Sequence, residues 1–481
     1  MSERAFTLGI DVGTTSVKVV AVEDSGEVIA EAESTQPLAT PRPGWTEQQP
    51  ADWWDGACKA VREIVARLDG RQPDAVGLTG QMHGMVPLDA DGEVIRPAIL
   101  WNDQRTGDAV REIDAAIGRR TLIERGGNPA ITGFQLAKVV WLKHAEPDSF
   151  RRLRHVLFPK DYLGFRLTGR AVAEPSDASG SNCFDLAKGV WDVDILSELG
   201  IAAELYPELV ASDAIVGTVT EAAAAATGLR AGTPVVAGAG DNAAAATGLG
   251  LSSANPELGS VSLGTSGVLF APIARPTPDP MGRVHLFCHA DGGYYLLGVT
   301  LAAAGSLQWL RDTLFPGMDF AELSALAESS APGANGVLFQ PYLAGERTPY
   351  MDPELRGAWR GLTLATRQAD LIRAVLEGVA FSQRDSLEVM RPLTSPTRLL
   401  ATGGGSRSRF WLQILADAME LPLTQLAGAP GASYGAALLA HRGLGGEAQP
   451  HLQEVASVAP KPDRALATAY AEYRALSPGA L

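Results

Sequence analysis

Residues 6–22 read FTLGIDVGTTSVKVVAV, and residues 260–270 read SVSLGTSGVLF. In both stretches an apolar run is followed by a short turn of glycine and hydroxyl side chains, and then by a second apolar run. This pattern predicts two antiparallel strands joined by a tight turn. The first stretch continues through Asp24-Ser25-Gly26 to a third expected strand at 28–30. The chain is therefore expected to open on an antiparallel meander.

The recurrence of this opening suggests that the chain consists of two related halves. We place the boundary near the Gly- and Ser-rich stretch 250–253, which gives an N-terminal domain over residues 1–250 and a C-terminal domain over residues 251–481.

Helical spacing of apolar residues predicts a helix over 51–68 that Asp52 could cap, and an amphipathic helix after Thr366. A short strand at 399–401 is expected to precede a glycine turn and a helix over about 409–419. Beyond Gly443 we expect one helix on the surface or a frayed end. Strands and helices together place the chain in the α/β class.

Composition excludes several classes of protein. The 481 residues include 46% hydrophobic and 20% charged residues, which is typical of a folded globular protein with a sizeable core. The formal net charge of −15 opposes non-specific binding to nucleic acid or to an anionic membrane surface. The most apolar stretch, 235–251, is interrupted by Asp241, Asn242 and glycines, so we expect no membrane span.

The three cysteines, Cys58, Cys183 and Cys288, are far apart and odd in number. They indicate neither a disulfide framework nor a zinc site, and they favour a reducing cytoplasm. The beginning of the chain enters strand-like sequence at once and shows no apolar core of a signal peptide.

The first turn combines groups that suit a phosphate. Thr14, Thr15 and Ser16 offer hydroxyls and clustered N–H groups between the carboxylate of Asp11 and the ammonium of Lys18. Such a turn can cradle phosphate, and the carboxylate can hold hydrated magnesium. Taken alone, the turn could equally be an ordinary hairpin whose hydroxyls bind its own backbone.

Two further turns strengthen the phosphate interpretation. The turn at 263–267 repeats the Gly-Thr-hydroxyl pattern, so one turn from each half could grip a triphosphate across a cleft. The run 402–408, TGGGSRS, lets a phosphate or a ring approach the backbone where a helix begins, although a plain tight turn is the commoner use of such a run. Neither the Gly-x-x-x-x-Gly-Lys-Ser/Thr pattern of P-loops nor the Gly-x-Gly-x-x-Gly and His-Glu-x-x-His patterns of dinucleotide-binding and zinc-protease sites occurs in the sequence.

Asp241 follows the apolar run 235–240 among residues too small to shield its charge. One interpretation is a cap for a helix over 242–247. The other is a general base, because an ionised aspartate within hydrogen-bond range can accept a hydroxyl proton.

Two polar clusters, Gln81-Met82-His83 and Trp101-Asn102-Asp103, also follow apolar runs. They are expected at strand ends, where the ligand sites of α/β sheets collect, although either could be structural. His285 and His289 are four apart, and we interpret them as structural because a strand would separate them.

Taken together, these motifs resemble those of the FGGY carbohydrate kinases from about residue 6 to about residue 440. The residues that carry the resemblance are 11–16 (DVGTTS), 45–50 (WTEQQP) with Trp53 and Trp54, 80–84 (GQMHG), 100–103 (LWND), 159–162 (PKDY), 240–242 (GDN), 262–267 (SLGTSG), 342–349 (YLAGERTP) and 403–407 (GGGSR). Gln49 departs from a frequent aspartate, and 357–361 (GAWRG) departs from a more aromatic stretch.

The resemblance implies two actin-like, ribonuclease-H-type domains that flank a nucleotide and sugar cleft, with ATP and Mg²⁺ as cofactors. Asp241 then corresponds to the general base, and Asp11 to the carboxylate that holds magnesium through water. The phosphate-binding residues would be Thr14, Thr15, Ser16, Lys18, Gly264, Thr265 and Ser266. The nucleoside site would comprise Gly404, Gly405 and Ser408, and the sugar pocket Met82, His83, Trp101, Asp103 and Asn242.

The implied reaction is the ATP-dependent phosphorylation of a sugar. Met82-His83 after Gln81 favours a ketopentose, and D-xylulose, phosphorylated on its 5-hydroxyl, is the expected substrate. Ribulose, gluconate or glycerol are alternatives within the family, because small changes in a pocket shift preference by only about 1–3 kcal/mol. An actin-like ATPase without kinase activity is the alternative from another class. Partners are expected to be the sugar and ATP, with no nucleic acid and no membrane, and a homodimer is plausible from the resemblance.

Overall fold

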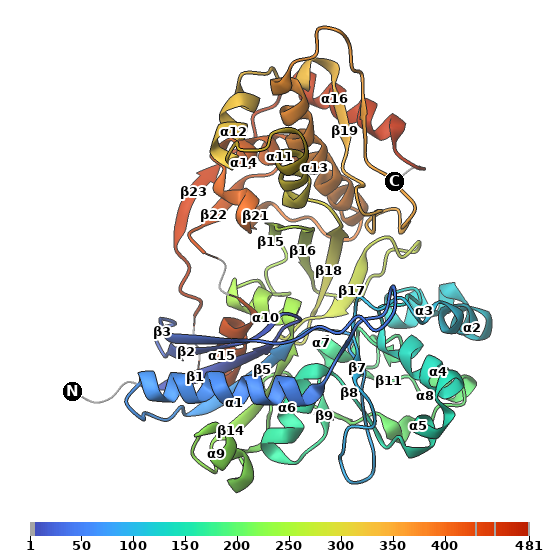
Figure 1. Cartoon of the computed structure of the whole chain (residues 1–481), viewed down its shortest axis with the longest axis vertical. Coiled ribbons are helices and arrows are strands. Elements are labelled where there is room, and N and C mark those ends of the chain that lie inside the picture. Colours follow the sequence, from blue (N-terminus) through green and yellow to red (C-terminus); the bar gives the residue numbers. More distant parts are fainter. Residues whose placement is uncertain (1–4, 429–430, 447–448, 480–481) are drawn as a thin grey trace. The chain divides into compact units, whose positions relative to one another are not determined.

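The computed structural model of the chain describes residues 5–428, 431–446 and 449–479 (Figure 1). It divides into two compact units. The first unit comprises Met1–Ser253, Leu286–Tyr294 and Pro430–His451, and the second comprises Ala254–His285, Tyr295–Ala429 and Leu452–Leu481. Two segments that a division at residue 250 assigns to the second domain therefore belong to the first unit. Residues 1–4, considered above as the beginning of the chain, lie outside the described residues.

The elements of the first unit are β1 (Phe6–Val12), β2 (Ser16–Glu23), β3 (Val28–Thr35), β4 (Glu47–Gln48), α1 (Pro50–Arg67), β5 (Ala75–Gly80), β6 (Val86–Leu88), β7 (Ala98–Ile99), α2 (Gly107–Ile117), α3 (Arg119–Gly126), α4 (Gln135–Ala145), α5 (Pro147–Arg152), β8 (His155–Leu157), α6 (Pro159–Thr168), β9 (Val172–Ala173), α7 (Pro175–Ala178), β10 (Phe184–Asp185), β11 (Val190–Trp191), α8 (Val193–Glu198), the 3₁₀ helix η1 (Ala203–Leu205), β12 (Glu208–Leu209), β13 (Ile215–Thr218), α9 (Glu221–Thr227), β14 (Pro234–Gly240), α10 (Asp241–Gly248) and α15 (Ala432–Gly443).

The elements that follow α10, α15 apart, are β15 (Leu258–Leu263), β16 (Gly267–Ile273), β17 (His285–Cys288), β18 (Tyr294–Thr300), α11 (Ala304–Leu314), α12 (Phe320–Glu328), the 3₁₀ helix η2 (Ala334–Gly336), β19 (Leu338–Gln340), β20 (Ala358–Arg360), α13 (Gln368–Met390), β21 (Arg398–Thr402), the 3₁₀ helix η3 (Gly404–Arg407), α14 (Arg409–Met419), β22 (Leu423–Leu426), β23 (Glu454–Val458) and α16 (Arg464–Leu476).

The first unit is built on a six-stranded sheet with the order β13-β14-β5-β1-β2-β3. Strands β1, β5 and β14 are parallel neighbours, whereas β2, β3 and β13 pair antiparallel at the two sides. The three central strands consist almost wholly of buried residues, as expected for parallel strands covered on both faces.

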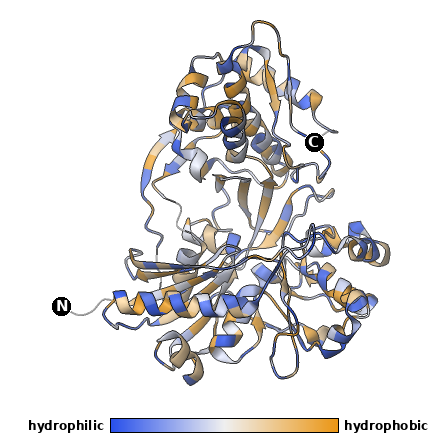
Figure 2. Cartoon of the chain, viewed as in Figure 1, coloured by the Kyte–Doolittle hydropathy of each residue, from blue (hydrophilic) through white to orange (hydrophobic). Residues whose placement is uncertain are grey.

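Helices cover both faces of this sheet. Helix α1 packs on β2 and β3, and its residues alternate between hydrophobic and hydrophilic along its length (Figure 2). Helix α15 packs on β1 and β5 at close range, because a Cβ on Gly9 would lie 1.7 Å from the carbonyl oxygen of Ser433 and one on Gly77 would lie 1.9 Å from that of Ala436. A segment near the end of the sequence therefore forms part of the core of the first unit.

The second sheet repeats the order of the first. It runs β17-β18-β16-β15-β21-β22-β23, with β15 parallel to β21, β21 parallel to β22, and β16 and β23 antiparallel to their neighbours β15 and β22. The central arrangement of one hairpin and two further parallel strands is the same as in β2-β1-β5-β14. This agreement supports the duplication that the two related turns suggested.

Most expected elements are present, with shifted ends. The α/β class is confirmed, and α14 begins and ends where the sequence predicts. The cap assigned to Asp52 is wrong, because helix α1 begins at Pro50 after Gln49 and Asp52 lies inside its first turn. The end of the chain holds a strand, β23, besides the expected helix. Within the described ranges, no helix combines the length and the apolar character needed to cross a bilayer.

Candidate active site

The carboxyl ends of β1, β5 and β14 bring the predicted groups of the first unit to one edge of its sheet. Asp11 in β1 and Ala239 in β14 both lie beside Thr79 of the central strand β5. The strand end of β5 leads to Met82 and His83, and that of β14 leads to Asp241. Ligand sites of parallel sheets collect at such an edge.

Asp241 is the first residue of helix α10. The helix is capped by Gly240 without a side-chain hydrogen bond, so the interpretation of Asp241 as a side-chain cap is wrong. The amide of Asn242 donates to Oδ1 of Asp241 at 2.9 Å and orients the carboxylate. Burial raises the pKa of Asp241 to about 6, and the hydrogen bonds from the backbone and side chain of Asn242 oppose this rise.

Asp11 has a carboxylate oxygen suited to a cation. Its Oδ1 is buried and makes no hydrogen bond within the described part of the chain. Burial and the nearby negative charge of Asp241 raise its pKa to about 7, and Lys18, its cross-strand partner, acts in the opposite direction. A Mg²⁺ ion bound mainly through waters and phosphates needs only one or two protein carboxylates. These residues therefore fit the magnesium site that the family implies.

Three glutamines hold the turn between β1 and β2, a feature that the sequence analysis missed. Gln81 receives a hydrogen bond from Oγ1 of Thr14 at 3.1 Å, and Gln36 binds the carbonyl oxygen of Gly13 at 2.5 Å. Gln48 donates to the carbonyl oxygen of Thr14 at 2.8 Å. Within the turn, Thr15 is exposed and Ser16 is half-buried. The motif 45–50, which contains Gln48, could have indicated these hydrogen bonds to the turn, because a polar side chain just before a buried helix needs hydrogen-bond partners.

Met82 and His83 follow β5 after one intervening residue, Gln81. The amide of Asn242 lies 3.7 Å from Sδ of Met82, so these two predicted pocket residues are brought together. Nδ1 of His83 donates to the carbonyl oxygen of Gly180 at 2.8 Å, and its ring stacks on Phe134 with centroids 4.5 Å apart.

Trp101 and Asp103 differ in their surroundings. Trp101 is 38% exposed, and its indole N–H donates to Oγ1 of Thr14 at 3.1 Å, which links it to the first turn. Asp103 is fully buried and accepts hydrogen bonds from the backbone N–H of Thr46 and from the guanidinium of Arg105. With these partners Asp103 holds the loop together, and its direct contact with a sugar stays a prediction.

In the second unit, the turn at 264–266 rests on the beginning of helix α11. The carbonyl oxygens of Gly264 and Thr265 accept hydrogen bonds from Ala304 at 2.8 Å and from Ala303 at 2.9 Å. The adjacent parallel strand β21 ends in the glycine turn, since Ser262 in β15 pairs with Thr402. Both predicted turns of this unit therefore leave the same edge of its sheet.

Gly403 requires the absence of a side chain. Its φ is 84°, and a Cβ there would lie 2.7 Å from the carbonyl group of Leu263. The close approach places Gly404 and Gly405 next to the 264–266 turn. Ser408 then caps helix α14 by accepting from the backbone N–H of Trp411 at 3.3 Å.

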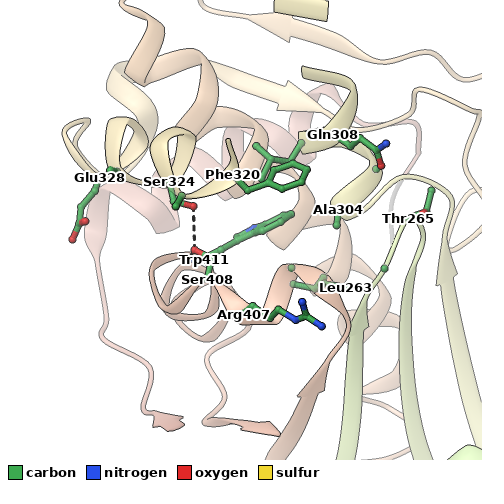
Figure 3. Close-up of a pocket in the computed structure, with 17 residues that line it drawn as sticks. Leu263, Thr265, Ala304, Gln308, Phe320, Ser324, Glu328, Arg407, Ser408 and Trp411 are labelled. Carbon is green, nitrogen blue, oxygen red and sulfur yellow. Dashed lines mark hydrogen bonds between the residues drawn. The ribbon is translucent and has the colours of Figure 1, made fainter. Parts of the chain in front are cut away.

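These turns line a pocket of about 740 Å³ within the second unit (Figure 3). Five predicted residues line it, namely Gly264, Thr265, Gly404, Gly405 and Ser408; Ser266 does not. The pocket is large enough for a nucleotide, and it is mostly apolar with a few polar groups, as ligand sites usually are.

The pocket wall formed by helices α11 and α12 is absent from the sequence prediction. Phe320 and Ser324 of α12 line it, and Oγ of Ser324 lies 3.2 Å from Oγ of Ser408, as the dashed line in Figure 3 shows. Gln308 of α11 and Trp411 of α14 complete this wall. Helix α12 has no motif of its own, so only its packing beside α14 could reveal its part in the site.

The sequence matches the model of the N-terminal domain of the FGGY family of carbohydrate kinases over residues 6–248. It matches the model of the C-terminal domain of the same family over residues 259–444. The chain is 38% identical to the xylulose kinase of Bacillus subtilis (strain 168) over 444 residues, which cover 92% of this chain and 88% of that protein.

Solved structures agree with this similarity. A xyloylose kinase from Brucella ovis aligns with a TM-score of 0.92 at 37% identity, covering 98% of this chain and 99% of that one. A xylulose kinase from Rhodospirillum rubrum aligns with a TM-score of 0.93 at 32% identity, covering 98% of both chains. The predicted actin-like fold is confirmed by this similarity, and so is the resemblance stated from the motifs. The chain belongs to the FGGY family of carbohydrate kinases.

Proposed function

We propose that the protein transfers the γ-phosphate of ATP to the 5-hydroxyl of D-xylulose, with Asp241 as the general base. The observation that carries this proposal is the placement of Asp11, Asp241 and the Met82-His83 turn at the carboxyl ends of three neighbouring parallel strands. The similarity to xylulose kinases over most of the chain supports the choice of sugar.

Asp241 has the properties of a base for a sugar hydroxyl. Its pKa of about 6 leaves the carboxylate ionised at neutral pH but makes it a better proton acceptor than an ordinary aspartate. The proton passes from the hydroxyl to a carboxylate oxygen as the new O–P bond forms, while the bond between the γ-phosphorus and the β,γ-bridging oxygen breaks and ADP leaves. The hydrogen bond from Asn242 to Oδ1 keeps the carboxylate in one orientation during the transfer.

Asp11 is the residue that would hold Mg²⁺ through water, in agreement with its unpartnered Oδ1. When bound, the ion neutralises charge on the β- and γ-phosphates and aligns them for transfer. Thr14, Thr15, Ser16 and Lys18 supply hydroxyl, N–H and ammonium groups beside it. Phosphoryl transfer requires mainly such positioning and charge stabilisation from a protein.

The nucleotide would occupy the pocket of the second unit. Thr265 and the glycines of the 403–405 turn allow phosphates to approach the backbone, and Ser266 lies beyond the lining residues but on the same turn. Phe320, which is 44% exposed, offers an aromatic face to the nucleobase.

Sugar choice would rest on the turn of Met82 and His83 together with Trp101 and Asn242. The contacts of Asp103 with Thr46 and Arg105 suggest that it shapes this pocket from behind. Among the alternative substrates, ribulose differs from D-xylulose only in the configuration of one carbon, whereas glycerol is shorter and gluconate is longer and carries a carboxylate. Small differences of the first kind change preference modestly unless a buried polar group is left unpaired.

The test measures ADP release with xylulose, ribulose, gluconate and glycerol in the presence of ATP and Mg²⁺. We expect xylulose to give the highest kcat/KM. Equal or better use of another sugar overturns the choice of xylulose, and ADP release that ignores every sugar supports an ATPase instead.

Asp241→Asn tests the base. We expect sugar-dependent ADP release to fall by at least about a hundredfold, the lower end for loss of a general base, while binding of a non-hydrolysable ATP analogue stays within twofold. Asp74→Asn is the control, since Asp74 is exposed just before β5 at the opposite edge of the same sheet. Turnover by the Asp241 variant close to the wild-type rate would remove Asp241 from the mechanism.

A further inference from the structure

Residues at the beginning of helix α4 contact the turn that carries His83. Phe134, which precedes the helix, stacks on the His83 ring with centroids 4.5 Å apart. Gln135 donates its side-chain amide to the carbonyl oxygen of Gly84 at 3.0 Å. One turn later, Nζ of Lys138 donates to the carbonyl oxygen of His83 at 2.7 Å. Residues three apart share a helix face, so both side chains reach the same turn.

Lys138 has an unusual environment for an ammonium group. It has no exposed surface, and the structure gives it no salt bridge within the described residues. Its second hydrogen bond goes to the carbonyl oxygen of Gly133 at 2.5 Å. The helix around it belongs to an apolar cluster that includes Leu136 and Val139. A buried cation with no carboxylate in contact with it is unfavourable, so Lys138 lowers stability unless its two carbonyl partners compensate.

The two carbonyl groups lie at places where the backbone needs support. His83 has a φ of 68°, a left-handed conformation that is unfavourable for a residue with a Cβ. That conformation turns the carbonyl of His83 toward α4 and the imidazole toward Gly180. Gly133, the second acceptor, lies next to Phe134 and approaches the carbonyl group of Trp101 so closely that a Cβ would lie 2.6 Å from its oxygen.

We propose that Lys138 is a positioning residue of the sugar site, which fixes the left-handed His83 turn and the adjacent Gly133-Phe134 loop through their carbonyl oxygens and thereby sets the affinity for the sugar. This inference rests on the proposed function, because it assumes that His83 contacts the sugar. The two hydrogen bonds of Lys138 go to backbone carbonyl groups and not to the predicted base Asp241.

The position also couples sugar binding to pH. Burial lowers the pKa of Lys138 to about 7, with Asp103 raising it and Arg105 lowering it. The imidazole of His83 is the other titratable group at this turn. Below pH 7 the ammonium makes charge-assisted hydrogen bonds to both carbonyls; above pH 7 the neutral amine makes weaker ones. The KM for the sugar is therefore expected to rise as the pH increases through about 7.

The experiment compares Lys138→Met and Lys138→Gln with the wild-type enzyme in steady-state assays from pH 6 to pH 8.5. Lys138→Met is expected to raise the KM for the sugar at pH 6.5 at least tenfold and to leave the KM for ATP within twofold. Lys138→Gln keeps two N–H donors without a charge, so it should recover part of the affinity and remove the rise of KM with pH.

Lys143→Met is the matched control. Lys143 lies on the same helix and also donates to a backbone carbonyl, that of Leu199 at 2.8 Å, but away from the His83 turn. It should change neither KM by more than twofold. An unchanged sugar KM in Lys138→Met, or equal losses for sugar and ATP, overturns the proposal.

Hydrogen exchange separates this result from a failure of the proposed function. Lys138→Met is expected to accelerate exchange of the amides at residues 83–85, whereas Lys143→Met is not, and this readout needs no turnover. If Lys138→Met leaves the exchange rates of these amides unchanged, Lys138 does not fix the His83 turn, and this conclusion holds even if no sugar proves to be a substrate. If Lys138→Met does not fold, the proposal is tested by the wild-type enzyme and Lys138→Gln. A sugar KM that rises with pH in the wild-type enzyme but not in Lys138→Gln supports it, and a sugar KM that is independent of pH in both overturns it.

Discussion

Half-buried Asp241 and fully buried Lys138 both have pKa values close to the physiological range, and these values are shifted there from opposite sides. Burial raises the pKa of the carboxyl group to about 6 and lowers that of the ammonium group to about 7. Desolvation disfavours the charged form in both cases, which is why an acid and a base shift in opposite directions. In the first unit, therefore, the proposed base and the proposed positioning residue are both in their charged form only within a narrow interval of pH.

This interval predicts a bell-shaped dependence of kcat/KM for the sugar on pH. Asp241 is a base only when ionised, so the rate should fall about tenfold for each pH unit below 6. Above about 7 the neutral form of Lys138 should lower kcat/KM through a rise in KM. Stopped-flow or coupled assays at saturating ATP and Mg²⁺ provide the measurement. Lys138→Gln should lose only the alkaline limb, and a profile that stays flat down to pH 4.5 would contradict the assignment of Asp241.

At the scale of elements, the turn between β1 and β2 owes its shape to a strand residue outside the hairpin. Gln48 of β4 is 2% exposed; it donates to the carbonyl oxygens of Thr14 and Pro37 and accepts from Trp53 and Gln81. All four hydrogen-bonding positions of its amide are thus used. Replacement by an apolar side chain would leave several buried polar groups without partners, each at about 1–3 kcal/mol.

We therefore expect Gln48→Leu to lower the free energy of unfolding by roughly 2–4 kcal/mol and to raise the KM for ATP, because the phosphate-binding turn loses its support. Denaturant titration and steady-state assays measure the two effects. Gln49→Leu is the control, since Gln49 is exposed and makes no side-chain cap to helix α1. Equal stability of the two variants would show that the network does not maintain the turn.

Local sequence determined the hairpins, the glycine turns and helix α14, because each depends on residues close together in the chain. The strand before Asp241 was predicted in the same way, from a run of small and apolar residues, and the role of Asp241 as a base stays a prediction. The glutamine network and the wall formed by Phe320 and Ser324 could not be predicted this way. Their partners lie far away in sequence, and a side chain that binds a distant backbone group has no local signature.

On the scale of the whole molecule, each of the two units is built from stretches that are not consecutive in the sequence. The repeated Gly-Thr turn predicted two related sheets, and both have the same central strand order. The sequence did not predict that residues 430–451 belong to the first unit. Most residues of helix α15 are small or apolar, a composition that indicates burial but not the sheet against which the helix packs.

This assignment predicts how fragments behave. Residues 1–253 alone lack α15, so the faces of β1 and β5 that Ser433 and Ala436 cover would be exposed to solvent. Exposed apolar strands of this kind favour aggregation. We expect this fragment to bind a hydrophobic dye and to unfold without a cooperative thermal transition.

The same fragment joined through a flexible Gly/Ser linker to residues 430–451 should regain a cooperative transition, as measured by calorimetry. A control that carries residues 454–476 on the same linker should not, because β23 and α16 belong to the second unit. Cooperative unfolding of residues 1–253 alone, near the transition temperature of the full chain, would show that α15 is dispensable for the first sheet.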